Sequence, residues 1–211
     1  MRAVIFDMDG VIIDSEPIYA KLEGGFFDEK GLYVPLPVRK TFVGGSMTTM
    51  WAKVAELNPG TSPDELRAAY QIYKNKIPFH YKEILNKGIP ELLEYLKTSG
   101  CKIGLASSTI RKTVTQVLSE CGLLTYFHAL VCGDEVVNGK PDPEIFLKAA
   151  AALDVSPSEC IVIEDSHNGI TAAKSAGMYV IGKADTRFNQ DVTAADKIIT
   201  DILEITPDLL K

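Results

Sequence analysis

This chain of 211 residues has few of the residues that mark several classes of protein. It contains three histidines and four cysteines. No two cysteines form a Cys-x-x-Cys pair and the histidines are not spaced as metal ligands, which argues against a zinc site. No stretch approaches the roughly 18 uninterrupted apolar residues that a membrane span requires. The net charge of −6 argues against the basic face of a nonspecific nucleic-acid binder, so we expect no nucleic-acid polymer as a partner.

The cysteines and the N-terminal residues indicate the cellular compartment of the protein. Most of the cysteines stand beside apolar positions, which favours reduced, partly buried thiols over disulfides. The first apolar run stops at Asp7 and is too short for the core of a signal peptide. We therefore expect a cytoplasmic protein, and we expect it to be a monomer. The four cysteines are Cys101, Cys121, Cys132 and Cys160.

The segment that follows the first predicted strand is expected to contain helices only. Residues from about 15 to about 81 show no convincing strand, whereas a short strand and a loop precede them. Ser62 and Pro63 are a typical helix start, with a capping serine before a proline at the first helical position. Gly24 and Gly25 weaken the prediction of the first helix. The predicted helices cover residues 17–30, 46–57 and 63–84.

From about residue 88, short apolar strands alternate with helices, which predicts a parallel sheet covered on both faces. Such sheets bind ligands at the carboxyl ends of their strands. The predicted fold class is α/β, with a Rossmann-like parallel sheet core over residues 1–14 and 82–211 and an inserted all-helical domain over residues 15–81. The predicted strands cover residues 102–106, 129–132, 160–163, 178–181 and 197–200, and the helices 90–98, 110–121, 143–153 and 169–176.

Two aspartates, Asp7 and Asp9, end the first predicted strand. Residues two apart on a strand point the same way. Neighbouring like charges raise at least one pKa, unless a divalent cation or another positive group compensates them. The pair therefore indicates a metal-assisted site. Taken alone, two aspartates before Gly10 are equally typical of an ordinary turn.

Polar residues also follow later strands, and each has a simple structural explanation. Hydroxyl residues can cap the next helix, a lysine before a proline is usually solvated, and acidic residues favour a helix N-terminus. Asp14 is better explained as a helix cap than as a catalytic group. These polar groups are Ser107-Ser108-Thr109, Lys140 and Glu164-Asp165-Ser166.

Taken together, these motifs resemble those of the haloacid dehalogenase superfamily of aspartyl-phosphate hydrolases, in the same order and with similar spacing. The helical insertion stands where the β-phosphoglucomutase-like branch carries its cap. The resemblance implies a Mg²⁺-dependent phosphatase that acts on a small phosphorylated metabolite, a sugar phosphate or a nucleotide. The matching segments are Asp7-Met8-Asp9-Gly10-Val11, Ser107, Lys140-Pro141 and Glu164-Asp165-Ser166.

The resemblance also implies roles for the acidic residues. Asp7 would be the nucleophile that forms an aspartyl-phosphate, which divides one difficult step into two. Asp9 would protonate the leaving group and then activate water. The protein ligands of Mg²⁺ would be the carboxylates of Asp7 and Asp165 and the main-chain carbonyl of Asp9, with Glu164 assisting nearby.

Three further groups would hold the phosphate. Ser107 and the main-chain N–H of Ser108 would bind phosphoryl oxygens. Lys140 would bind both the phosphate and the Asp7 carboxylate, and would supply positive charge in a fixed position.

The alternative activity is that of a β-phosphoglucomutase-type phosphomutase. That branch carries a histidine at the position of Tyr19 and a phosphate-gripping arginine at the position of Met47. Its Ser-Lys-Asn is replaced here by Thr109-Ile110-Arg111. These departures favour hydrolysis. The region around Tyr19 and the loop over residues 42–47 are expected to contact the leaving group.

A signalling receiver domain is an alternative of another class. Receiver domains also combine acidic groups, a hydroxyl and a lysine around a phosphorylated aspartate. Their acidic pair and acceptor aspartate stand on different strands, however, and they lack a helical insertion. The close spacing of Asp7 and Asp9 favours the enzyme. The roles of Arg111 and His167 stay open.

Overall fold

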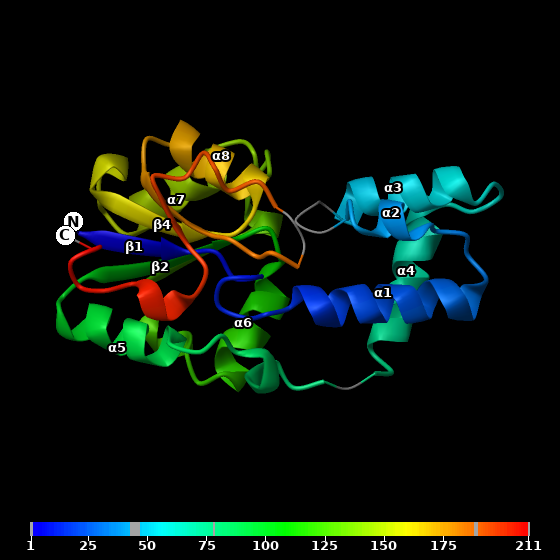
Figure 1. Cartoon of the computed structure of the whole chain (residues 1–211), viewed down its shortest axis with the longest axis horizontal. Helices are drawn as coiled ribbons and strands as arrows, with labels where there is room; N and C mark the ends of the chain where they lie inside the picture. Colours follow the sequence, from blue (N-terminus) through cyan, green and yellow to red (C-terminus); the bar gives the residue numbers. More distant parts are fainter. Residues whose placement is uncertain (1, 43–46, 78, 188–189, 211) are drawn as a thin grey trace. The chain divides into compact units, whose positions relative to one another are not determined.

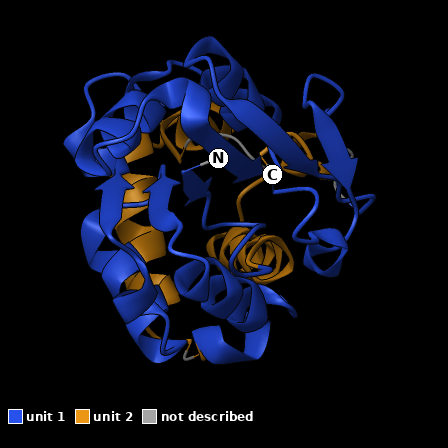
Figure 2. Cartoon of the chain, turned by 90° about the vertical axis from the view of Figure 1, so that its left-hand side faces the viewer, with its two compact units in different colours: residues 1–14, 81–211 blue, residues 15–80 orange. Residues whose placement is uncertain are grey.

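The computed structural model describes residues 2–42, 47–77, 79–187 and 190–210 (Figure 1). The chain divides into two compact units (Figure 2). Met1–Asp14 and Tyr81–Lys211 form an α/β unit, and Ser15–His80 form a helical unit. The second boundary lies one residue earlier than expected, because Tyr81 belongs to the α/β unit.

The described part of the α/β unit contains a six-stranded sheet in the order β3-β2-β1-β4-β5-β6, and every pairing is parallel. The predicted α/β fold class is thereby confirmed. The chain leaves β3 at one edge and returns to pair β4 with β1, so the strand order reverses beside β1, where such sheets bind ligands. The strands are β1 (Ala3–Phe6), β2 (Lys102–Ser107), β3 (Ala129–Cys132), β4 (Cys160–Glu164), β5 (Tyr179–Lys183) and β6 (Lys197–Ile199).

Helices cover both faces of this sheet. Figure 1 shows α7 and α8 on one face and α5 on the other. Ile5 of β1 is fully buried in one cluster with Phe146 of α7 and Ile170 of α8. Burial on both faces explains why these strands are apolar throughout rather than alternating. The longer helices are α5 (Ile89–Thr98), α6 (Arg111–Glu120), α7 (Glu144–Ala152) and α8 (His167–Ser175), and the 3₁₀ turns are η1 (Tyr81–Ile84), η2 (Leu124–Tyr126), η3 (Gly133–Glu135), η4 (Pro157–Glu159) and η5 (Ile202–Glu204).

The helical unit has an aromatic core. The Phe26 ring lies 5.7 Å from that of Trp51 and 5.4 Å from that of Tyr70, measured between centroids. Gly25 lies within α1, and a Cβ there would lie 2.4 Å from the hydroxyl of Tyr73 on α4. The glycine therefore permits close helix packing. The helices are α1 (Glu16–Lys30), α2 (Leu36–Arg39), α3 (Met47–Leu57) and α4 (Pro63–Lys74).

Three local predictions were wrong. The third helix ends at Lys74 rather than near residue 84, and proline at position 78 lacks the N–H that a continuing helix needs. Ser62 occupies the cap position of α4, but its side chain makes no capping hydrogen bond. Asp14 is not a helix cap, because it accepts hydrogen bonds from Arg187 instead.

No helix in the described residues is long and apolar enough to cross a membrane.

Candidate active site

A buried lysine joins two carboxylates at the carboxyl edge of the sheet. Asp7 directly follows β1, and its N–H donates to the carbonyl of Ile163 on the neighbouring β4 at 2.9 Å. Lys140 Nζ donates to Asp7 Oδ1 at 2.6 Å and to Glu164 Oε1 at 2.8 Å. A third hydrogen bond of 3.1 Å goes to the carbonyl of Ala106 at the end of β2. The three donors of the ammonium group are therefore all used.

Burial controls the charges of this cluster. The side chains of Lys140, Asp7 and Glu164 are 6%, 9% and 1% exposed. Burial raises the pKa of Asp7 well above its usual range; Lys140 opposes this shift, and the charges of Glu164 and Asp9 add to it. Burial lowers the pKa of Lys140, but Asp7 and Glu164 outweigh that effect and raise it, so the ammonium keeps its charge. Additional positive charge at the site would favour the carboxylate form of Asp7.

Glu164 is fixed from its other side. Its Oε2 accepts hydrogen bonds from the N–H of Ser166 at 2.7 Å and from the hydroxyl of Ser166 at 3.0 Å. Ser166 also caps α8, because its Oγ accepts the N–H of Gly169 at 3.1 Å. A Cβ on Gly169 would lie 1.6 Å from Glu164 Oε1, so the glycine leaves room for this carboxylate. Glu164 is thus a rigid acceptor for Lys140.

Thr109 contacts the second aspartate. Its hydroxyl donates to Asp9 Oδ2 at 2.9 Å, and its N–H donates to Ser107 Oγ at 3.1 Å. The sequence offered no local signal for the first contact, since Thr109 and Asp9 are 100 positions apart. None of the hydroxyl residues at positions 107–109 occupies the cap position of the next helix, α6, because Ile110 stands there. The first N–H of α6, that of Arg111, donates to Asp134 Oδ1 at 2.9 Å instead.

The loop that contains Ser108 is held against the end of β3. The N–H of Gly133 donates to the carbonyl of Thr109 at 3.0 Å. A Cβ on Gly133 would lie 2.0 Å from the carbonyl oxygen of Ser108. Only a glycine at position 133 therefore permits this approach.

Asp165 lies against the loop that follows Asp9. Gly10 has a φ of +81°, and a Cβ there would lie 1.9 Å from Asp165 Oδ2. The same loop is fastened by Asn86, whose Nδ2 donates to the carbonyls of Gly10 at 3.2 Å and Val11 at 2.8 Å. The loop between β1 and the helical unit therefore brings the Asp165 carboxylate close to the main chain beside Asp9.

The donor chemistry of this edge fits Mg²⁺. Among the residues that the structure describes, no three histidine, cysteine, aspartate or glutamate side chains form a ready metal cluster. Mg²⁺ does not require one, because it usually keeps water and substrate oxygens beside one or two carboxylates. Asp7 and Asp165 offer two carboxylates on either side of a short loop, and the main-chain carbonyl of Asp9 is a further oxygen donor.

Arg111 and His167, whose roles the sequence left open, contact other groups. Arg111 donates to Glu135 through its Nε at 2.5 Å and its Nη2 at 2.7 Å, and Nη2 also donates to the carbonyl of Leu130. His167 is 57% exposed, with its Nδ1 4.0 Å from Asp191 Oδ2. Among the described residues, these contacts tie Arg111 and His167 to groups other than Asp7, Lys140 and Glu164.

Two of the residues that were expected to contact the leaving group, Tyr19 and Met47, lie on helices of the helical unit. Tyr19 lies on α1, and the ammonium of Lys74 lies 4.5 Å from the centre of its ring. Met47 is the first residue of α3. Residues 43–46 of the expected loop are outside the described residues.

The model of the family described as haloacid dehalogenase-like hydrolase matches residues 1–177. The chain belongs to this family. The resemblance seen in the sequence motifs is thereby confirmed.

Curated and solved members of the haloacid dehalogenase-like family cover most of the chain. Beta-phosphoglucomutase of Bacillus subtilis is 35% identical, over 100% of this chain and 94% of the relative. The phosphorylated carbohydrates phosphatase of Thermotoga maritima is 34% identical, over 84% and 82%. The crystal structure of a protein described as a putative beta-phosphoglucomutase of Thermotoga maritima superposes with a TM-score of 0.75 at 33% identity, covering 94% of each chain. The protein is therefore an enzyme of phosphoryl hydrolysis or transfer.

Proposed function

We propose that this enzyme is a Mg²⁺-dependent phosphatase that hydrolyses a small phosphate monoester through an aspartyl-phosphate on Asp7. The observation that carries the proposal is the ammonium of Lys140 held between Asp7 and Glu164. A fixed positive charge beside a carboxylate suits attack on a phosphate ester, whose own negative charge repels nucleophiles.

The first step uses both aspartates. The Asp7 carboxylate attacks phosphorus, the ester P–O bond breaks, and Asp9 gives its proton to the leaving oxygen. In the second step Asp9 takes a proton from a water molecule, which attacks phosphorus and frees Asp7 and inorganic phosphate. The Thr109 hydroxyl donates a hydrogen bond to Asp9 Oδ2 and so holds this carboxyl group in position for the proton transfers.

Phosphate binding involves three groups besides the aspartates. Lys140 balances the charge of Asp7 and of the phosphoryl oxygens. Ser107 Oγ accepts the N–H of Thr109, so its own proton can be donated to a phosphoryl oxygen, and the N–H of Ser108 adds a second donor.

Asp7, the Asp9 carbonyl and Asp165 would hold Mg²⁺. When bound, the ion neutralises phosphate charge and favours the ionised form of the nucleophile.

Hydrolysis is favoured over transfer because a mutase must also grip a second phosphate. In the segment that replaces Ser-Lys-Asn, the only cation is Arg111, and Glu135 already binds it through two hydrogen bonds. Tyr19 and Met47 stand where a histidine and an arginine would be expected. Transfer remains the second candidate, because the similarity to the Bacillus subtilis mutase covers the whole chain.

The helical unit is proposed as a cap that selects the leaving group. A sugar phosphate is the first substrate class to test, since one relative is named for phosphorylated carbohydrates; a nucleotide is the second. The proposal includes a monomeric, cytoplasmic enzyme, and the four free cysteines support a reducing compartment.

The test is a screen of phosphate monoesters with Mg²⁺, using the wild type, Asp7→Asn and Asp9→Asn. Both variants are expected to lose turnover by about 10²-fold or more, because each removes a covalent or a proton-transfer contribution. Asp64→Asn, on the exposed first turn of α4, is the matched control. Undiminished hydrolysis by Asp7→Asn would exclude Asp7 as the nucleophile. Conversion of a hexose 1-phosphate to its 6-phosphate, rather than to free sugar, would identify a mutase.

A further inference from the structure

Asp14 ends the turn that begins at Asp9, and the proposed reaction does not use it. It is the last residue of the α/β unit before the chain enters the helical unit. Arg187, from the segment that follows β5, donates to Asp14 Oδ2 through Nη1 at 2.9 Å and to Asp14 Oδ1 through Nη2 at 2.7 Å. Two hydrogen bonds from one planar guanidinium fix both the position and the direction of this carboxylate.

Arg187 is itself held in place by a second carboxylate, that of Asp185, two residues after the end of β5. Asp185 Oδ1 accepts hydrogen bonds from the main-chain N–H of Arg187 at 2.8 Å and from its Nε at 3.0 Å. Asp185 Oδ2 accepts further hydrogen bonds from Nε at 3.1 Å and from Nη2 at 2.5 Å. These hydrogen bonds from Arg187 also lower the pKa of Asp185. The guanidinium is therefore anchored beside the sheet and presents its outer nitrogens to Asp14.

The main chain links Asp14 to Asp9 over a short distance. Ile13, directly before Asp14, forms a parallel bridge with Asp9. The carbonyl of Ile13 accepts the N–H of Gly10 at 2.7 Å, and the N–H of Ile13 donates to the carbonyl of Met8 at 3.1 Å. Residues 8–13 thus form one closed turn, so a shift of Asp14 would be passed on to Asp9 through a few hydrogen bonds.

Other hydrogen bonds to this turn come from the segment that returns from the helical unit. The N–H of Asp14 donates to the carbonyl of Ile84 at 2.7 Å, and Asn86 donates to the carbonyls of Gly10 and Val11. These hydrogen bonds tie the two connections of the helical unit to each other. Arg187 instead ties Asp14 to the segment after β5, and so to the sheet itself.

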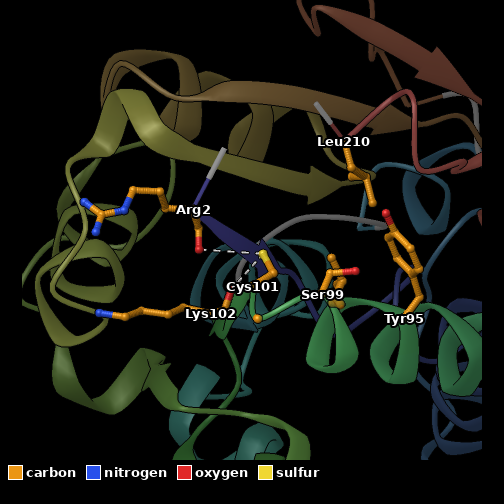
Figure 3. A pocket seen from close by; sticks show the side chains of 8 residues that line it. Arg2, Tyr95, Ser99, Cys101, Lys102 and Leu210 are labelled. Atoms are coloured by element: carbon orange, nitrogen blue, oxygen red, sulfur yellow. Dashed lines mark hydrogen bonds between the residues drawn. The ribbon is translucent and has the colours of Figure 1, made fainter.

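An arginine at the opposite end of β1 provides a contrast. Arg2 borders a cavity of about 270 Å³, and its side chain points away from Tyr95 and Leu210 on the other side of that cavity (Figure 3). Arg2 pairs with Glu159 at 3.6 Å, with 67% and 39% of the two side chains exposed. Exposed pairs of this kind contribute little to stability. The side chains of Asp14 and Arg187 are also partly exposed, so we expect their contact to act through geometry rather than through stability.

We propose that Arg187 is a positioning residue for the proton transfers of Asp9, and that it acts through Asp14. This inference rests on the proposed function, in which Asp9 protonates the leaving oxygen. The contact between Arg187 and Asp14 keeps the turn over residues 8–13 in one place, and with it the direction of the Asp9 carboxyl group. A small misplacement of a reacting group slows its step strongly. Loss of the contact should therefore cost most where the leaving group most needs a proton.

The experiment compares kcat/KM of the full-length protein for phenyl phosphate and p-nitrophenyl phosphate in the presence of Mg²⁺. The two esters have similar shapes, but p-nitrophenolate is the weaker base and leaves with less help from an acid. Arg187→Met and Asp14→Ala are each expected to lower kcat/KM about tenfold for phenyl phosphate and less than about threefold for p-nitrophenyl phosphate. Arg2→Met is the matched control and should keep the wild-type kcat/KM for both esters.

Two further variants complete the comparison. The double variant Arg187→Met/Asp14→Ala should lose no more than either single variant, because both substitutions remove the same contact. Asp9→Asn should depend on the leaving group at least as strongly, since it removes the acid itself. An unfolded fraction of any variant lowers both rates equally, so the ratio of the two kcat/KM values reports on the folded enzyme alone.

Three results would overturn the inference. They are wild-type kcat/KM for both esters in Arg187→Met, equal losses for the two esters, or single losses that multiply in the double variant. If one of these occurs while Asp9→Asn depends strongly on the leaving group, the inference fails and the proposed function stands. If Asp9→Asn loses activity equally on both esters, Asp9 is not the acid, and the proposed function fails together with the inference.

Discussion

Lys140 Nζ lies 2.6 Å from Asp7 Oδ1, although 133 positions separate the two residues. The contact exists because β1 is central in the sheet and the loop before α7 crosses its carboxyl end. The same ammonium binds Glu164 at the end of β4, so one lysine links groups from three distant segments. Most of the predictions below concern the residues that hold this arrangement in place.

Glu164 is expected to act by positioning Lys140. Glu164→Gln keeps an acceptor oxygen but loses its charge, and should lower kcat about tenfold. Glu164→Ala removes the acceptor and should lower kcat by about 10²-fold, since a hydrogen bond to a charged group contributes about 1.5–3 kcal/mol. Steady-state kinetics on the best ester would measure both effects. Glu159→Gln, just before β4 on the surface, is the control; wild-type kcat in Glu164→Ala would refute this role.

Thr109 is expected to orient Asp9 through its hydroxyl. Thr109→Val should lower kcat about tenfold with little change in KM, because the hydrogen bond acts on proton transfer rather than on substrate binding. Thr109→Ser retains the hydroxyl and should restore most of the loss. Equal losses in the valine and serine variants would point to packing of the Thr109 methyl group instead.

Gly10 is expected to be irreplaceable because of Asp165. Gly10→Ala would place a Cβ 1.9 Å from Asp165 Oδ2 and displace that carboxylate. We expect turnover to fall by about 10²-fold and the Mg²⁺ concentration for half-maximal activity to rise. Gly100→Ala separates this collision from backbone strain, since Gly100 has a φ of +70° and nothing within 4 Å of a Cβ. That control should lose about 1–2 kcal/mol of stability but no activity.

Glu23 is expected to make stability depend on pH. Burial, with the charge of Glu16 adding, raises the pKa of Glu23 from 4.5 to about 7. The folded protein therefore binds this proton more tightly than the unfolded chain does. The stabilisation that the protonated Glu23 contributes to the folded state is complete below about pH 4.5, and it is lost as the pH rises through about 7.

Glu23→Gln imitates the protonated form and should remove this loss. Thermal unfolding at pH 8 should show a gain of roughly 2 kcal/mol, after allowance for partial solvent screening, and a much smaller effect at pH 5. Glu29→Gln, exposed on the same helix, should change neither value appreciably. An equal effect at both pH values would indicate that burial does not shift the pKa of Glu23.

Local patterns predicted the secondary structure well where a strand or helix is defined by its own residues. The strand Ala129–Cys132 was placed at its true ends, because a short apolar run with turn residues on both sides defines a buried strand. The helix that begins at Pro63 was extended ten residues too far, to about residue 84 instead of Lys74. Its end depends on where the chain leaves the helical unit, which apolar periodicity alone does not reveal.

The sequence by itself determined the α/β class, the inserted helices and the order of the acidic and hydroxyl motifs, because each of these is written in neighbouring residues. Only the tertiary structure decided which distant side chains meet. Thr109 with Asp9, Lys140 with Glu164, and Asp165 with Gly10 depend on the strand order and on glycines that let backbone and carboxylate approach.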